Sequence, residues 1–271
     1  MTEFPHKEPR TEVFASSHTG EQLEQLSGIV GKQPYVSDGP WISATGLELL
    51  QTAAEAGKLG RFGIAGKSAE LAPLVDAGLL TSKGALTGQG RLVTSPWKDS
   101  LASLRISAQF RGHAAAFQAW LAPEGCLVLA GPSYSQFLAG TPRTGFHQLD
   151  FLALDHLYPA IAAWTGIAPA WSLAAAPLAV DPQVLQARFT SEAVPVPAGA
   201  DAPLANMWRQ PWFIWQLVLE PSSGPPLTYV NAGEAGHYHL GRDDAGAHLN
   251  VRPSSMLYRD IATAVDRAVH R

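Results

Sequence analysis

The chain has 271 residues, of which 46% are hydrophobic and only 15% are charged. Globular proteins usually carry about 25% charged residues, so this surface must hold many small or polar side chains or expose apolar area. The net charge is −4 and the 19 Lys and Arg are scattered along the chain, whereas nucleic-acid-binding proteins usually carry a basic stripe. The composition therefore argues against DNA, RNA or an anionic membrane as the main partner.

The single cysteine, Cys126, excludes an intramolecular disulfide. It lies in the apolar run of residues 126–130, where a buried and inert thiol is expected. The N-terminal residues carry charges but lack the apolar stretch of a secretory signal. No apolar run approaches the roughly 20 residues that cross a bilayer. We therefore expect a cytoplasmic protein without membrane insertion.

The first 94 residues divide into a polar part and a helical part. We expect residues 1–40 to be tail and loop. Ser43 is a good N-cap for a helix over residues 43–56, which Gly57 ends. A second helix is predicted over residues 68–76. Residues 41–94 should thus form a helical segment packed on the main domain, which we expect to cover residues 95–271.

From residue 95 the pattern changes to short strands. Residues 101–110 alternate apolar and polar side chains, which is typical of a strand that is covered on one face. Further strands are predicted over residues 115–121, 126–130, 136–138 and 147–152. A helix over residues 155–165 follows, and Gly166 ends it.

Residues 166–206 are rich in Ala and Pro. Within them, Asp181 as N-cap and Pro182 in the first turn predict a helix over residues 181–189. A linker or loop is expected from 193 to 203. The strand pattern then returns over residues 212–219, 227–230, 236–240 and 248–251. A last helix is predicted over residues 256–269.

The two strand regions share one order of elements. Each has strands joined by Gly-containing turns, then a strand beginning near a His, and then a helix. Leu157, Tyr158 and Ile161 of the first helix recur at a constant offset in the last helix. We therefore predict an α+β fold of two quasi-repeated antiparallel ββββα halves with pseudo-twofold symmetry, preceded by the helical segment. The halves are expected at residues 95–166 and 207–271. Chance similarity of two β-meanders is the alternative.

The strand at residues 212–219 is apolar on both faces. Phe213, Trp215 and Leu217 suit the core, whereas Trp212 and Ile214 fall on the opposite face. That face either packs a helical segment from residues 20–90 or is exposed for a partner. Exposed apolar patches usually mark binding sites, and Trp is favoured at interfaces. We therefore take Trp208, Trp212 and Ile214 as candidate partner-binding residues.

Three stretches resemble a known family. They are LVDAGLLTSKGALTGQGRLVTSPWKDSLASLRI, FRGHAAAFQAWLAPEGCLVLAG and GRDDAGAHLNVRPSSMLYRDIATAVDRAV. They resemble the entry into the first strand, the Arg/Gly hairpin and the closing strand with terminal helix of the EspG family of ESX (type VII) secretion-associated proteins from actinobacteria. The resemblance begins near Leu74 and continues to the C-terminus.

The resemblance implies a mixed α/β fold with internal quasi-twofold symmetry. It also implies a cytosolic chaperone that keeps helical PE–PPE-type secretion substrates soluble before export. The family has no catalytic residues to carry over, so the resemblance implies no enzyme. The expected partner is a helical secretion substrate, the expected state is a monomer or homodimer, and no cofactor is expected.

His237, His239 and His248 are the best metal candidates in the chain. His237 and His239 point to one face of a predicted strand, and His248 could join them from the neighbouring strand. Three His, or two His with a carboxylate from Asp243 or Asp244, would suit zinc or non-haem iron. A metal-dependent enzyme that uses these His is therefore one alternative, although solvated or hydrogen-bonded His are the expected state.

Other chemistry has little support in the sequence. Asp150 with the neighbouring Asp155 and His156 could suggest acid–base work, but adjacent helical residues do not face each other. No Gly-x-Ser-x-Gly nucleophile elbow occurs, since residues 131–135 read Gly-Pro-Ser-Tyr-Ser. The Gly residues at positions 84, 88 and 90 are expected in turns and not in a phosphate loop.

A transcriptional regulator is the second alternative. Residues 43–94 are similar to a winged helix, with the helix over residues 68–76 in the place of the recognition helix. Recognition helices present Arg, Lys, Asn or Gln to the groove, and this helix offers almost none. A structural helix pair is therefore the expected role of this segment.

Overall fold

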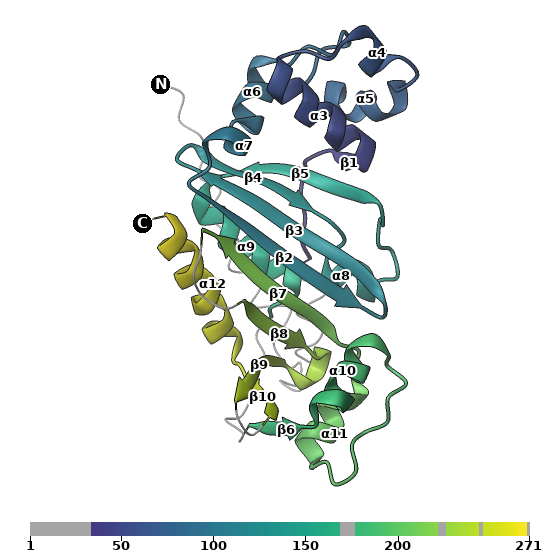
Figure 1. Cartoon of the computed structure of the whole chain (residues 1–271), viewed down its shortest axis with the longest axis vertical. Helices are drawn as coiled ribbons and strands as arrows, with labels where there is room; N and C mark the ends of the chain where they lie inside the picture. Colours follow the sequence, from purple (N-terminus) through teal and green to yellow (C-terminus); the bar gives the residue numbers. More distant parts are fainter. Residues whose placement is uncertain (1–33, 169–176, 222–225, 244–245, 270–271) are drawn as a thin grey trace, which may run out of the picture.

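The computed structural model describes residues 34–168, 177–221, 226–243 and 246–269. It is a mixed α/β structure around one antiparallel sheet of ten strands in the order β1-β5-β4-β3-β2-β7-β8-β9-β10-β6 (Figure 1). The strands are β1 Trp41–Ser43, β2 Ala102–Phe110, β3 His113–Ala122, β4 Gly125–Ala130, β5 Phe146–Leu152, β6 Leu178–Val180, β7 Phe213–Glu220, β8 Leu227–Asn231, β9 His237–Asp243 and β10 Gly246–Val251.

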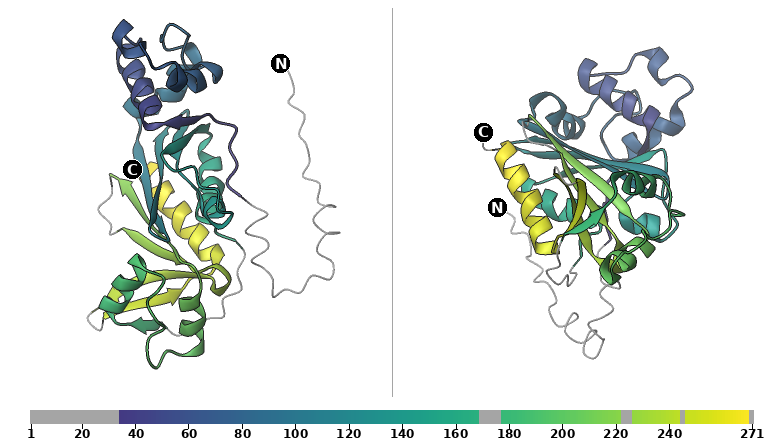
Figure 2. Two further views of the ribbon diagram at one scale, coloured as in Figure 1. Left: turned by 90° about the vertical axis from the view of Figure 1, so that its right-hand side faces the viewer. Right: turned by 60° about the horizontal axis from the view of Figure 1, so that its bottom comes forward.

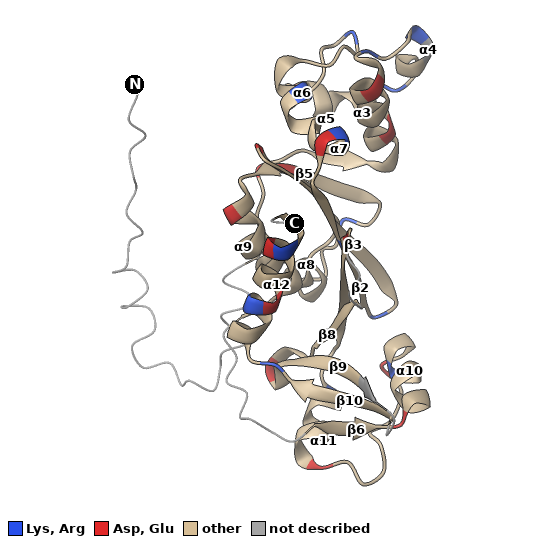
Figure 3. Ribbon diagram, turned by 60° about the vertical axis from the view of Figure 1, so that its left-hand side comes forward, with Lys and Arg blue, Asp and Glu red and all other residues tan. Residues whose placement is uncertain are grey.

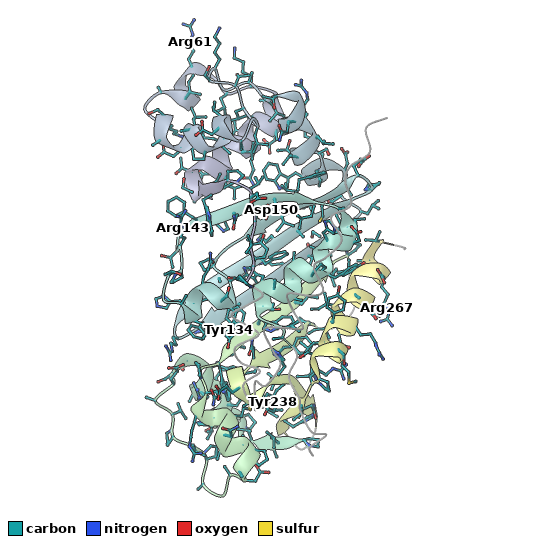
Figure 4. The ribbon with its side chains drawn as sticks, turned by 180° about the vertical axis from the view of Figure 1, so that it is seen from behind. Arg61, Tyr134, Arg143, Asp150, Tyr238 and Arg267 are labelled. Atoms are coloured by element: carbon teal, nitrogen blue, oxygen red, sulfur yellow. The ribbon has the colours of Figure 1, made fainter. Side chains whose placement is uncertain are left out.

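Helices cover both faces of this sheet, but unevenly. In the described part of the chain they are α3 Ala44–Ala56, α4 Arg61–Ile64, α5 Ser68–Asp76, α6 Gly88–Thr94, α7 Pro96–Asp99, α8 Tyr134–Leu138, α9 Leu154–Thr165, α10 Pro182–Thr190, α11 Ala202–Arg209, the 3-10 turn η2 Gly233–Ala235 and α12 Ser254–Val269. Figure 4 shows α8, α9 and α12 crossing one face of the sheet.

The alternation along β2 and β7 decides which side chains enter the main core. On β7, Phe213, Trp215 and Leu217 are buried on the face covered by α8, α9 and α12, as the sequence predicted. On β2, Leu104 and Ile106 point the same way. Because β2 pairs antiparallel with β7, both rows of apolar side chains join one core.

Two groups of helices cover the ends of the opposite face. The α3–α7 lobe (residues 44–99) covers β4 and β5, where Leu127, Leu129 and Leu149 are buried beneath it. The α10–α11 lobe (residues 182–209) covers β8 to β10, where Val230 and Leu249 are buried. The two lobes lie at opposite ends of the long axis of the molecule (Figures 1 and 2).

Several predicted helix ends are confirmed with their chemistry. The Ser43 hydroxyl accepts a hydrogen bond from the Gly46 backbone N–H at the start of α3, and Gly57 ends that helix with φ +76°. The Asp181 carboxylate caps α10 in the same way, with Pro182 in the first turn. Gly166 ends α9 with φ +71°.

Three local predictions need correction. Residues 136–138, expected as a strand, belong to the helix α8, which begins with a capping box in which Ser133 and Gln136 each bond the other's backbone. The expected linker at 193–203 ends early, because Asp201 caps α11 at Ala202. The strand β6, which no local pattern indicated, pairs with β10 at the edge of the sheet.

No helix within the described ranges combines the length and the apolar character that a membrane-crossing helix requires.

Candidate functional site

The middle of the sheet presents an open face between the two lobes. It is formed by alternate residues of β2, β3 and β7 that point away from the main core. The register pairs them into four rows across the three strands: Trp120–Ser103–Glu220, Gln118–Arg105–Val218, Ala116–Ser107–Gln216 and Ala114–Gln109–Ile214. We call these twelve residues the open face.

Every residue of the open face is exposed or half-buried, whereas the residues between them on the same strands are buried almost throughout. Figure 1 shows β2, β3 and β7 uncovered in front, with the α3–α7 lobe at one end and the α10–α11 lobe at the other. In the described ranges, no helix covers the centre of this face. The sheet therefore has one covered face and one face that is open between two walls.

The open face mixes small and large side chains and is nearly neutral. Its charged residues are Arg105 and Glu220, and Ser and Ala occupy four of its positions. Figure 3 shows that charged residues are likewise sparse on the other strands. A partner would therefore be recognised here by shape and hydrogen bonding more than by a strong field.

A pocket lies where the open face meets α10. It has a volume of about 390 Å³ and is lined by Gln109 and Ile214 from the sheet and by Arg188 and Phe189 from the helix. Arg111 lies at its rim, on the β2–β3 turn, where it adopts a positive φ of 49°. The Arg111 Nε donates to the Glu192 carboxylate at 3.0 Å in an exposed ion pair.

Trp208 and Trp212, which were predicted to be partner-binding residues, are buried in the structure. Trp208 and Trp212 are each 3% exposed, and their rings meet edge to face at a centroid distance of 5.1 Å. Their indole N–H groups donate to the backbone carbonyls of Val194 and Met207. Trp208 therefore offers no exposed contact surface, whereas the half-buried Ile214 lines the pocket together with the buried Trp212.

The segment that covers the second face of β7 also differs from the one expected. The apolar second face of β7 was predicted to pack residues 20–90 or to be exposed. Instead, Trp212 and Ile214 pack within the α10–α11 lobe. This lobe is formed by residues 182–209, which directly precede β7 in the chain. The second face of β7 is therefore covered by a segment that is near it in sequence.

The three His of the metal hypothesis lie on the face of the sheet that α12 covers. His237 is buried, and this burial lowers its pKa to about 4. The pKa of His239 is also lowered, first by burial and then by the nearby Arg252. Within the described residues, no group of three or more His, Cys, Asp or Glu gathers in a metal-binding arrangement. The described geometry therefore gives no support to a zinc or iron site here.

An ion pair that the sequence did not indicate lies beside His239. The Arg252 guanidinium donates to both Asp260 oxygens at 2.6 and 2.8 Å, and the Tyr229 hydroxyl donates to the same carboxylate at 2.9 Å. This network ties the end of β10 and β8 to α12 and lines a second pocket of about 430 Å³. No periodic signal could have found it, because the partners are eight residues apart across a strand-to-helix junction.

Asp150 and His156 both line a third pocket, of about 440 Å³. The Asp150 carboxylate, however, accepts a hydrogen bond from the Tyr35 hydroxyl at 2.7 Å and another from the Ser37 hydroxyl. Burial and the neighbouring Asp150 raise the pKa of Tyr35. Asp150 therefore holds the segment at Tyr35–Ser37 against β5, and this hydrogen bonding accounts for its position without acid–base chemistry.

Other sequence candidates have structural roles. Ser133 is buried and caps α8, so it is no exposed nucleophile. Cys126 is buried as expected, and burial raises the pKa of its thiol to about 12. Gly84 lies in a turn, but Gly88 and Gly90 belong to the first turn of α6, which corrects the expectation of turns there.

The similarity to a winged helix is limited in the structure. The candidate recognition helix, α5, turns Leu71 and Leu74 into the lobe core and packs beside α3 and β1. The two strands expected of a wing reduce to isolated bridges at Lys58–Ala85 and Leu80–Leu86, and α6 follows them. The arrangement gives the lobe a core but does not present a row of groove-reading side chains.

The chain was compared with models of known protein families and with curated proteins. No family model matches it, and no curated protein matches it significantly.

Proposed function

We propose that this protein is a cytosolic chaperone similar to the EspG family, which holds a helical type VII secretion substrate against its open face. The observation that carries the proposal is the twelve-residue open face between two helical lobes. Antiparallel sheets often leave one face solvated, but here both ends of that face are walled by helices. A walled and nearly neutral face suits a partner that is held as a folded helical unit.

The surface chemistry supports reversible protein binding. Ser103, Ser107, Ala114 and Ala116 on β2 and β3 have short side chains, so that a partner's backbone can approach these two strands there. Gln109, Gln118 and Gln216 add amide groups that can both donate and accept hydrogen bonds. Mixed small, amide and apolar groups are compatible with a partner that must later be released.

We also propose that residues 95–166 and 207–271 are quasi-repeats related by a pseudo-twofold axis between β2 and β7. The strand order supports this, because β2-β3-β4-β5 and β7-β8-β9-β10 extend in opposite directions from that central pair. Each set is followed by a helix, α9 or α12. The equivalent residues of the two helices, Leu157 with Leu257 and Ile161 with Ile261, are all fully buried.

The proposal would be tested by co-expression with the WxG- or PPE-type substrates encoded beside this protein. We expect one of them to co-purify as a stoichiometric complex on size exclusion. A Ser107→Trp variant should abolish the complex, because Ser107 lies in the centre of the open face. Trp is favoured in strands and Ser107 is exposed, so the variant should fold normally.

The matched control is Ser82→Trp. Ser82 is also exposed but lies in the α3–α7 lobe, outside the open face, so this variant should keep the complex. Failure to form a complex with every such substrate would contradict the chaperone function. Formation of a complex that Ser107→Trp leaves intact would contradict only the use of the open face.

A further inference from the structure

The pocket at the junction of the open face and α10 contains a buried cation. Arg188 is 4% exposed although its side chain lines a pocket of about 390 Å³. Its guanidinium carbon lies 4.6 Å from the centre of the Trp212 ring, on which it stacks. Buried Arg side chains usually pair with a carboxylate, since an isolated buried charge is costly.

The protein satisfies only part of this guanidinium. The Nη2 group donates to the backbone carbonyls of Trp208 at 3.2 Å and Gln210 at 2.8 Å. The buried Nε has no acceptor within hydrogen-bond distance among the described residues. Burial accordingly lowers the pKa of Arg188.

The carboxylate that lines the pocket, Glu192, already pairs with another Arg. Glu192 lines the same pocket, but both of its carboxylate oxygens accept from the Nε of Arg111, at 3.0 and 3.1 Å. The pocket lining therefore holds two guanidinium groups and one carboxylate, which leaves one positive charge without a matching partner. The Nε is itself buried and out of reach of a ligand in this conformation, so it is the surplus positive charge that favours an anionic ligand with a planar, hydrogen-bond-accepting group.

We propose that this pocket binds a carboxylate, presented by an acidic side chain of the segment that docks on the open face. The inference deepens the proposed function and rests on it for the carrier of that carboxylate. Gln109 and Ile214 belong both to the open face and to the pocket, so a segment crossing the face reaches the pocket without a break. Phe189 and Trp212 line the apolar part of the pocket, where the methylene groups of the acidic side chain would pack.

A purely structural role for Arg188 would be to hold the backbone after α11. The Nη2 hydrogen bonds to Trp208 and Gln210 account for that role, but they need neither the pocket nor an unpaired Nε. The two roles therefore predict different responses of the Arg188 side-chain NMR signal when a carboxylate is supplied.

The test is an NMR titration of the full-length protein with the α-amide of N-acetyl-glutamate, whose side chain carries its one carboxylate, and with the α-amide of N-acetyl-glutamine as the neutral matched probe. The Nε–H signal of Arg188, identified by its loss in Arg188→Lys, should shift saturably with the carboxylate probe and not with the amide probe. The Nε–H signal of Arg252, which already donates to Asp260 at 2.8 Å, should stay in place. Equal shifts with both probes, or none with either, would overturn the proposal.

Two variants sharpen the result. Glu192→Gln removes the competing carboxylate and should tighten binding of N-acetyl-glutamate about two- to fivefold, because an exposed ion pair is weak. In Arg188→Lys, the indole N–H signal of Trp164, which donates to the Gly131 carbonyl outside the pocket, should keep its position and so report an intact fold. The indole N–H signal of Trp212 should no longer respond to the probe. A response that persists in Arg188→Lys would place the binding elsewhere.

The titration and the co-purification fail independently. A carboxylate-specific shift without any co-purified substrate would keep the pocket and remove the proposed chaperone function. A substrate complex that Ser107→Trp abolishes, in a protein whose Arg188 shows no response to N-acetyl-glutamate, would keep the function and remove the carboxylate site.

Discussion

The Tyr158 hydroxyl donates a hydrogen bond to the Asp266 carboxylate at 2.6 Å, which joins α9 to α12 across the covered face of the sheet. The two residues are 108 positions apart in the chain, so this bond and the packing around it link two distant segments. Burial and the Asp266 partner raise the pKa of Tyr158 to about 12. The hydrogen bond is partly exposed, which limits its contribution to stability.

We expect Tyr158→Phe to lower the free energy of unfolding by about 1 kcal/mol, because it removes this hydrogen bond and little packing. Urea denaturation would measure the change. Tyr258→Phe is the matched control, since Tyr258 also lies on a helix, α12, and is 40% exposed. It should change stability by less than about 0.5 kcal/mol. Equal losses in both variants would contradict the coupling role of Tyr158.

The stability of the protein should fall in mild acid because of His237. Its pKa of about 4 in the folded protein lies below the ordinary His value of 6.5, so between these values the unfolded chain binds a proton that the folded chain does not. Stability is therefore complete above pH 6.5 and is lost as the pH falls toward 4, by on the order of 2 to 3 kcal/mol.

Urea denaturation at a series of pH values would test this, with His237→Gln expected to flatten the slope between pH 6.5 and 4. The control His156→Gln removes an exposed imidazole and should leave the slope due to His237 in place. A slope that is the same in wild type and His237→Gln would show that other groups cause the acid sensitivity.

Two Arg–carboxylate ion pairs should contribute differently to the free energy of unfolding. The Arg252–Asp260 pair is bidentate and its side chains are only 29% and 22% exposed, whereas those of Arg111 and Glu192 are 56% and 38% exposed. Asp260→Asn should therefore cost about 1 to 3 kcal/mol, since it leaves a partly buried guanidinium unpaired. Glu192→Gln should cost no more than about 1 kcal/mol. Thermal or urea denaturation of both variants gives the comparison, and the reverse order would contradict it.

Two glycines that end helices provide a test of packing at one backbone conformation. Gly57 and Gly166 both have a positive φ, near +76° and +71°. A Cβ on Gly57 would meet nothing within 4 Å, whereas one on Gly166 would lie 2.0 Å from the Tyr134 ring. Gly57→Ala should cost about 1 kcal/mol from backbone strain alone, and Gly166→Ala about 3 kcal/mol because overpacking is added. Equal losses in denaturation experiments would contradict the close contact with Tyr134.

Local chemistry made many elements predictable. Ser43 and Gly57 bound α3, Pro182 starts α10, and the alternation along β2 and β7 identifies the side chains that enter the core. These features depend on residues within a few positions of each other, so they can be predicted directly from the sequence. The one strand predicted wrongly, at residues 136–138, failed because the Ser133–Gln136 capping box outweighed a short apolar run.

The candidate site was less accessible to such reasoning. Trp208 and Trp212 are apolar and near the open face, but the sequence does not say that α10 and α11 fold over them. Arg188 is an ordinary charged residue in a helical pattern, and its burial depends on Trp212 and on backbone carbonyls some 20 positions further along the chain. Such contacts join segments that have no local signal for each other.

The sequence by itself determined the α+β class, most element boundaries and the division of each strand into two faces, because these follow from side-chain periodicity and capping. Tertiary structure decided that β2 pairs with β7, that two lobes cover only the ends of one face, and that Arg188 is buried beside a pocket. The physical reason is that the alternation of apolar and polar residues along a strand predicts which side chains lie on the same face. Which segment then covers that face is settled by long-range packing, which maximises buried apolar area over the whole chain.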